Sequence, residues 1–114
     1  FYFISLSLYL FYLKKNSYIF WTDWNRKNPK IERANMDGTH RKVIVSEDIG
    51  IPNGLYFDQR RQEVCWADVK TKKIECVQKD GSNRRIVTIQ QSQQFYPFDI
   101  TESGGNIYWS DWSR

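Results

Sequence analysis

Two cysteines and one histidine are the residues of this chain best able to do covalent or metal chemistry. Cys65 and Cys76 form no Cys-x-x-Cys motif, and His40 is the single histidine. Zinc would therefore lack ligands, because a structural site takes about four Cys or His side chains. The acidic residues are scattered, so no nucleophile and base stand together as an enzyme requires. We expect no enzyme activity, no metal and no cofactor, and the chemistry left to the thiols is a disulfide.

Tryptophan and aspartate recur along the chain at a nearly fixed interval. The stretch YIFWTDW at 18–24 returns as NIYWSDW at 106–112, with VCWAD at 64–68 between them. KIER and KIEC, MDGT and KDGS, and LYFD and FDIT also repeat, each pair 43 positions apart. A period of about 40 to 45 residues with an aromatic-x-Asp signature is typical of a propeller blade. The recurring pairs, 45 and then 43 positions apart, are Trp21 and Asp23, Trp66 and Asp68, and Trp109 and Asp111.

The elements between these landmarks have the composition of strands. Segments such as YIFWTD, KVIV, EVCWAD and RRIVTI are short, rich in aromatic and β-branched residues, and separated by Asp-Gly, Asn-Gly or Gly-Gly. One full period predicts strands at 54–58, 63–68, 73–78 and 84–89. The later strands of a preceding blade reach Val45, and the first two strands of a following blade lie within 96–112. The predicted fold is all-β, with about two four-stranded blades forming a fragment of a β-propeller.

The predicted strands bring the two thiols together. A turn centred on Lys70 and Thr71 pairs Asp68 with Lys73 and places Cys65 opposite Cys76. Directly opposed residues in antiparallel strands have Cα atoms about 4.5 to 5.5 Å apart, within the range of a disulfide. Persisting disulfides favour an oxidising compartment, so the register indicates an extracellular or lumenal protein. Two buried free thiols in a cytosolic sheet are the alternative.

The same strings resemble a known family. FWTDW and CWAD, each followed by a KIE strand and a DGT or DGS turn, and YWSDW at the same period resemble the YWTD blades, the class B repeats of low-density lipoprotein receptors. That resemblance implies a six-bladed extracellular propeller. Within the family, WTDWNRKNPKIERANMDG, IPNGLYFD, the cysteine spacing and YPF most resemble the nidogens, also called entactins, over residues 18–112.

The resemblance to nidogens implies a secreted basement-membrane protein whose propeller binds an EGF-like module of a laminin γ chain. The alternative within the family is the propeller of an endocytic or Wnt co-receptor, the ectodomain of a single-pass membrane protein. Flanking complement-type modules and a membrane span would indicate the receptor, and an N-terminal nidogen-type barrel would indicate the matrix protein.

Because the Trp and Asp recur in every cluster, we interpret them as structural residues of the blade. A Trp supplies about 150 to 250 Å² of surface that can fill the gap between blades. An Asp at the end of a strand can accept backbone N–H groups of the following turn. A Trp and Asp pair that touches ligand is the alternative, but every blade would then repeat the same site.

Ligand binding is expected where the repeats differ, because loops tolerate change. The first blade has WNRKNPK at 24–30 where the next has only VKTK. In a propeller this turn shares an edge with the connections at 46–53 and 90–97. The edge offers aromatic, guanidinium and amide groups, which are common at protein interfaces. The candidate ligand residues are Trp24, Arg26, Asn28, Asn53, Phe95 and Tyr96.

The charge pattern suggests a second ligand class. Seventeen Lys and Arg against thirteen Asp and Glu give a net charge of +4. Basic pairs in turns usually mark a solvated blade edge, and heparan sulfate or another polyanion is the functional alternative. We expect no nucleic-acid partner, because no recognised binding module is present, and no small-molecule substrate. The pairs stand at 14–15, 41–42, 60–61, 72–73 and 84–85.

Residues 1–13 are uncharged and mostly apolar. They are too short for a membrane span of about twenty residues, and they lack the basic start and small-residue end of a signal peptide. The repeat step puts 10–13 in the slot of LYFD, the innermost strand, while 1–9 match nothing and are either the end of a truncated membrane span or sequence foreign to the domain. We therefore divide the chain into an apolar segment, 1–16, and a partial propeller, 17–114.

Overall fold

The protein is all-β in the computed structural model, which describes residues 8–11, 18–89 and 94–112; no helix occurs among them. Strands follow one another as antiparallel neighbours in three sheets. The first sheet contains β1 (Leu8–Phe11), β2 (Tyr18–Asp23), β3 (Lys30–Asn35) and β4 (Lys42–Val45). The second contains β5 (Pro52–Asp58), β6 (Glu63–Asp68), β7 (Lys73–Gln78) and β8 (Arg85–Ile89). The third is the hairpin of β9 (Pro97–Ser103) and β10 (Asn106–Asp111).

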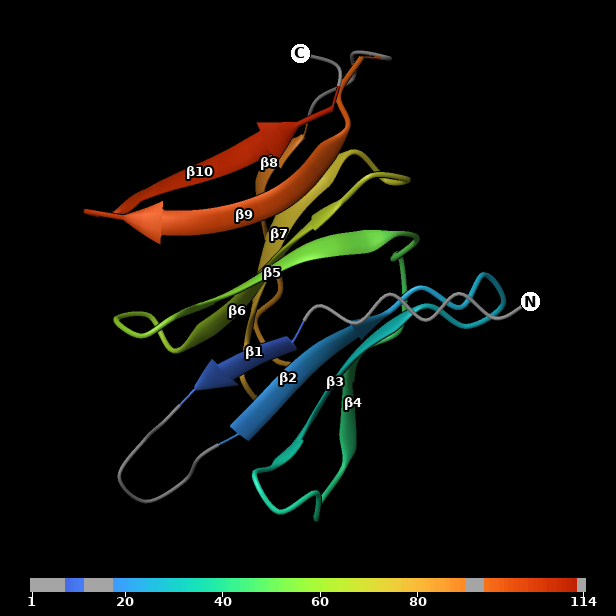
Figure 1. Ribbon diagram of the computed structural model, residues 1–114, viewed down its shortest axis with the longest axis vertical. Coiled ribbons are helices and arrows are strands. Elements are labelled where there is room, and N and C mark those ends of the chain that lie inside the picture. The colour runs from blue at the N-terminus through green and yellow to red at the C-terminus, as the bar shows by residue number, and fades with distance from the viewer. Residues whose placement is uncertain (1–7, 12–17, 90–93, 113–114) are drawn as a thin grey trace.

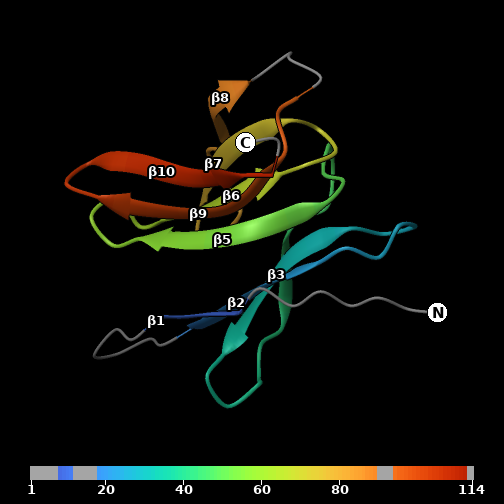
Figure 2. The ribbon, with the colours of Figure 1, turned by 45° about the horizontal axis from the view of Figure 1, so that its top comes forward.

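The three sheets lie face to face in chain order. Figures 1 and 2 show β5 between the first sheet on one side and the β9–β10 hairpin on the other. The predicted fold is confirmed: the chain contains two four-stranded blades and the first two strands of a third. The strands β6 and β7 occupy the predicted residues, β5 begins two residues earlier, and β8 begins one residue later.

The interior between the first two blades is aromatic and aliphatic. Phe20 of β2 stacks on Phe57 of β5, with ring centroids 5.5 Å apart, and Trp66 of β6 packs in the same cluster with no exposed surface. Alternate residues of β2 point to this interior, because side chains of a strand alternate between its two faces. Burying such side chains provides much of the free energy that holds the blades together, at about 25 cal/mol per Å².

A second interior separates the middle blade from the β9–β10 hairpin. Cys65, Ala67 and Ile74 line one side of it, and Ile100 and Phe95 line the other. The backbones approach closely here, since a Cβ built on Gly54 would lie 2.8 Å from the Cα of Asp99. The Asn-Gly step within β5 thus allows close packing between the blades.

Strand registers correct two predicted repeats. Leu55 pairs with Trp66 in the middle blade, and Ile100 pairs with Trp109 in the third, so the counterpart of Leu55 is Ile100. The predicted equivalence of LYFD with FDIT is wrong because the β9–β10 turn is two residues shorter. In the first blade Leu8 pairs with Trp21.

The innermost strand of the first blade is therefore β1, two residues earlier than predicted. It is hydrogen-bonded to β2, so the proposed boundary between residues 16 and 17 does not separate the apolar segment from the blade. The rest of that segment, 1–7 and 12–17 with the basic pair at 14–15, lies outside the described residues.

Candidate protein-binding rim

The two cysteines lie apart from the histidine in the structure, the cysteines in a disulfide and the histidine in a turn. A disulfide joins Cys65 and Cys76, which are directly opposed in β6 and β7 and buried. His40 lies in the exposed β3–β4 turn, where its Nδ1 is 3.1 Å from the side-chain nitrogen of Asn35. Within 8–11, 18–89 and 94–112, no three His, Cys, Asp or Glu side chains form a group that could hold a metal ion.

Asp68 ties the end of β6 to two loops. Its Oδ1 accepts the backbone N–H groups of Ile51, Lys70 and Thr71 at 3.0, 2.9 and 3.0 Å. Its Oδ2 accepts the N–H of Gly50 at 2.7 Å. The carboxylate is fully buried, so it fixes both the turn after β6 and the connection that leads into β5.

The other two repeated Asp residues hold equivalent places at the ends of their strands. Asp111 accepts the N–H of Tyr96 at 3.2 Å, which repeats the bond between Asp68 and Ile51. Asp23 accepts the N–H of Asn25 at 2.9 Å and forms an ion pair with Lys30 at 3.2 Å. In each blade the Asp organises the loops at one edge.

The three repeated Trp residues are buried to different extents. Trp66 is fully buried, Trp21 is partly buried, and Trp109 is 41% exposed. Trp109 makes an edge contact with Phe95, with ring centroids 6.2 Å apart. The first two Trp residues each lie beside a bidentate Glu–Arg pair whose guanidinium covers the ring: Trp21 with Glu32 and Arg41, and Trp66 with Glu75 and Arg84.

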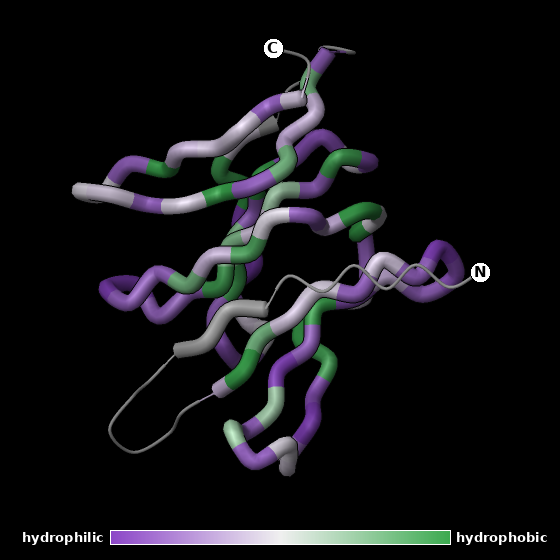
Figure 3. Tube along the Cα trace, in the orientation of Figure 1, coloured by the Kyte–Doolittle hydropathy of each residue, from purple (hydrophilic) through white to green (hydrophobic). Residues whose placement is uncertain are grey.

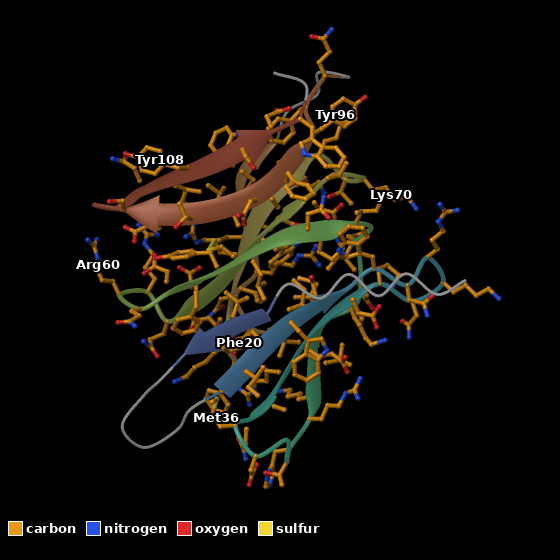
Figure 4. All side chains as sticks on the ribbon, in the orientation of Figure 1. Phe20, Met36, Arg60, Lys70, Tyr96 and Tyr108 are labelled. Carbon is orange, nitrogen blue, oxygen red and sulfur yellow. A yellow bond between two sulfur atoms is a disulfide. The ribbon has the colours of Figure 1, made fainter. Side chains whose placement is uncertain are left out.

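The three candidate ligand segments meet along one edge, here called the upper rim: residues 24–30, 46–53, 69–72, 94–97 and Trp112. The indole Nε1 of Trp24 donates to the carbonyl of Pro52 at 2.7 Å, which joins the β2–β3 loop to the next connection. The N–H of Val69 donates to Ile51 O at 3.1 Å, and Trp112 N–H donates to Tyr96 O at the same distance. Figure 4 shows Lys70 and Tyr96 near this edge and Arg60 at the opposite end of the strands.

The upper rim exposes only part of the predicted ligand set. Arg26 and Asn28 are exposed, Tyr96 is 41% exposed, and Trp24 is partly buried. Residues 90–93 of the predicted segment lie outside the described residues.

Two members of the predicted set need correction. Phe95 is 6% exposed, because it fills the interior between the middle blade and the third. Asn53 is 8% exposed, because it lies within β5 instead of the connection before it. Neither side chain presents a contact surface of the kind expected from the sequence.

Three residues of the upper rim were missed by sequence reasoning. The Lys72 ammonium lies 4.3 Å from the centre of the Tyr96 ring and donates to Phe95 O at 3.1 Å. Lys70 is exposed, and Trp112 is 75% exposed and stacks on Phe98 with ring centroids 4.7 Å apart. Lys70 and Lys72 belong to the short VKTK turn, and the signal that could have found them is its place on the same edge as the longer loop.

Comparison with known proteins identifies a repeat and a structural neighbour. The family model described as low-density lipoprotein receptor repeat class B matches residues 17–56. A chain of a solved crystal structure of a nidogen/laminin complex superposes with a TM-score of 0.73 at 41% sequence identity, covering 83% of this chain and 35% of that one.

Curated relatives come from both matrix and receptor groups. The chain is 44% identical over 91 residues to nidogen of Drosophila melanogaster, covering 79% of this chain and 6% of the relative. It is 39% identical over 95 residues to the vitellogenin receptor Yl of the same organism, covering 83% of this chain and 5% of the relative. The chain thus spans a small part of the proteins it matches.

Proposed function

We propose that this chain, which belongs to the family of low-density lipoprotein receptor class B repeats, is part of a non-enzymatic extracellular propeller that binds laminin-type EGF-like modules in basement membrane. The observation that carries the proposal is the similarity to a chain of the nidogen/laminin complex, at 41% identity over 83% of this chain. The superposition, with a TM-score of 0.73, supports an equivalent arrangement of the blades.

The chemistry of the upper rim supports a protein ligand. Arg26 supplies an exposed guanidinium and Asn28 an amide, both of which can bond to backbone and side chains of a partner. Tyr96 supplies an aromatic surface, and Lys72 beneath it restricts the ring before any partner arrives. A restrained aromatic anchor loses less conformational entropy on binding.

The disulfide supports the extracellular location. A buried cross-strand disulfide persists in secreted proteins and in the lumen of the secretory pathway. No helix of the described residues is long and apolar enough to cross a membrane.

Surface plasmon resonance on an immobilised laminin γ-chain EGF-like fragment would test this function. The analyte is the secreted protein with the complete propeller around this chain. We expect Arg26→Ala and Tyr96→Ala each to weaken binding, by about 2 kcal/mol or roughly 30-fold where the residue is a central contact. Arg60→Ala, at the opposite edge, is the control and should bind as the wild type does.

Each result decides between the candidate functions. Absence of wild-type binding at micromolar concentration would reject the laminin proposal and favour the receptor alternative, which the similarity to the vitellogenin receptor supports. Wild-type binding with both variants unchanged would keep laminin as the ligand and reject the upper rim as the contact surface. Asn53 is left unchanged in this series, because truncating a buried side chain would test stability instead.

A further inference from the structure

The edge opposite the upper rim carries basic residues that no carboxylate neutralises. This lower rim comprises the β3–β4, β5–β6, β7–β8 and β9–β10 turns. Figure 4 places Arg60 at this edge, and Figure 3 shows hydrophilic residues at the tip of the β5–β6 turn. Arg60 and Arg61 are both exposed and form no ion pair with any described residue.

The basic pairs of the sequence divide into two kinds in the structure. Arg41 and Arg84 each form a bidentate pair with a Glu of the neighbouring strand, and Arg85 pairs in the same way with Glu63 two strands away, at 2.8 to 3.2 Å. Their charges are compensated, so they add little to the field outside the protein. Arg60 and Arg61 have no such partner in the described structure, and Lys42 bonds to a neutral carbonyl instead. The three neutralising residues are Glu32, Glu75 and Glu63.

The uncompensated cations gather around the β7–β8 turn. The guanidinium of Arg33 donates to Lys79 O at 2.7 Å, and the ammonium of Lys42 donates to Asp80 O at 3.0 Å. Lys79 in turn reaches the side chain of Gln62 at 3.4 Å, next to Arg61 in the β5–β6 turn. Two blades therefore contribute cations to one continuous surface.

Arg60 extends this surface to the third blade. A Cβ built on Gly105, in the β9–β10 turn, would lie 4.0 Å from its Nη2. The surface thus follows successive turns along the edge, as a linear ligand would require.

The carboxylates of the lower rim are bound within their own turns. Asp58 accepts the N–H groups of Arg60 and Arg61 at 2.9 and 3.1 Å. Asp80 accepts the hydroxyl and the N–H of Ser82 at 2.6 and 3.0 Å, and these bonds lower the pKa of Asp80. Thr39 binds Asp37 in the same way, and Glu102 accepts Tyr56 and Gly105.

Against these acids stand five cations at or beside the turns: Arg33, Lys42, Arg60, Arg61 and Lys79. The five cations exceed the four acids (Asp37, Asp58, Asp80 and Glu102) by one charge, and Arg60, Arg61 and Lys42 are exposed.

We propose that the lower rim binds a sulfated glycosaminoglycan through Arg60, Arg61, Lys42 and Lys79. Sulfate groups along a linear chain match a row of donors on successive turns, and guanidinium groups bind such oxyanions with paired N–H donors. The site is separate from the upper rim, so a glycosaminoglycan and a protein ligand can be bound together. The proposal does not depend on laminin binding.

Binding to immobilised heparin at several salt concentrations would test this site on the secreted protein with its complete propeller. The double variant Arg60→Ser/Arg61→Ser removes two exposed cations but keeps the backbone N–H groups that bind Asp58. We expect it to elute at lower salt, and we expect the slope of log affinity against log salt to fall by about 2, one for each lost contact. Lys42→Ala should lower the slope by about 1 on the same reasoning.

The matched control is Arg26→Ser/Lys27→Ser, which removes two exposed cations from the upper rim and causes the same change in net charge. It should keep the wild-type slope, and chemically desulfated heparin should not retain the wild type. The proposal is overturned if the wild type passes through heparin at physiological ionic strength. It is also overturned if both double variants shift equally, because net charge alone would then explain retention. Equal melting temperatures for all variants establish that folding is unchanged.

Discussion

Replacing Asp68 by Asn tests whether this buried carboxylate organises the upper rim. An asparagine has the same shape but only one acceptor oxygen. In the most favourable orientation of its amide, the asparagine Oδ1 still accepts the three N–H groups that Oδ1 of Asp68 binds. The NH₂ group then faces the N–H of Gly50, whose nitrogen lies 2.7 Å from Oδ2 in the wild type.

The expected cost follows from these four bonds. An unpaired buried N–H costs about 1 to 3 kcal/mol, and each remaining bond loses about 1 kcal/mol when its acceptor is no longer charged. The total is about 4 to 6 kcal/mol. At about 2 to 4 °C per kcal/mol for a domain of this class, the melting temperature should fall by at least about 8 °C.

Asp58→Asn is the matched control, because both N–H bonds to Asp58 reach a single oxygen that asparagine retains. We expect a loss below about 1 kcal/mol for this exposed turn. Thermal unfolding of the secreted propeller by circular dichroism measures both variants, and hydrogen exchange in residues 69–72 localises the effect. Equal melting temperatures for wild type and both variants would refute the role assigned to Asp68.

Three further outcomes are expected. Trp66→Ala should cost about 3 to 5 kcal/mol of unfolding free energy and reduce secretion, measured as the ratio of protein in medium and cells; normal secretion would contradict its place in the core. Replacing Cys65 and Cys76 by Ser should cost about 3 kcal/mol, and a non-reduced digest of the wild type should contain the linked peptides, two hydrogens lighter than the free thiols; free thiols would contradict the pairing. Ser82→Ala should raise the pKa of Asp80 toward its ordinary value of 3.8 in a carboxyl NMR titration, because the hydroxyl bond is the main cause of its lowered pKa. Since folding lowers the pKa of Asp80, its contribution to stability is present above the unfolded pKa and is lost as pH falls through the folded pKa. An unchanged pKa of Asp80 in the Ser82→Ala variant would contradict the hydroxyl bond as the cause.

Much of the fold could be predicted because its information is local. Alternating apolar residues and turn residues define β6 and β7 at the residues the structure shows. A short turn then fixes their register, and the register alone places Cys65 opposite Cys76. The edge that carries the ligand loops was predictable for the same reason, since successive antiparallel strands return to it at a fixed interval.

The exposure of single residues on that edge was not predictable from the same pattern. Tyr96 and Phe95 are adjacent aromatic residues, yet Tyr96 is 41% exposed and Phe95 is 6% exposed. Which of them faces inward depends on how the third blade packs on the middle one. That packing includes a β9–β10 turn two residues shorter than the repeat suggests, which moves the register of β9 relative to the sequence landmarks.

The sequence by itself determined the blades, the disulfide register and the edge on which the candidate ligand loops meet, and only the tertiary structure decided which charges are compensated. The pairs 60–61 and 84–85 are both Arg-Arg in the sequence. Arg84 reaches Glu75 in the next strand and Arg85 reaches Glu63 two strands away, whereas Arg60 and Arg61 lie exposed in a hairpin turn. Ion pairing needs N–O distances below about 4 Å, and for residues on different strands that distance is set by pairing and twist of the sheet.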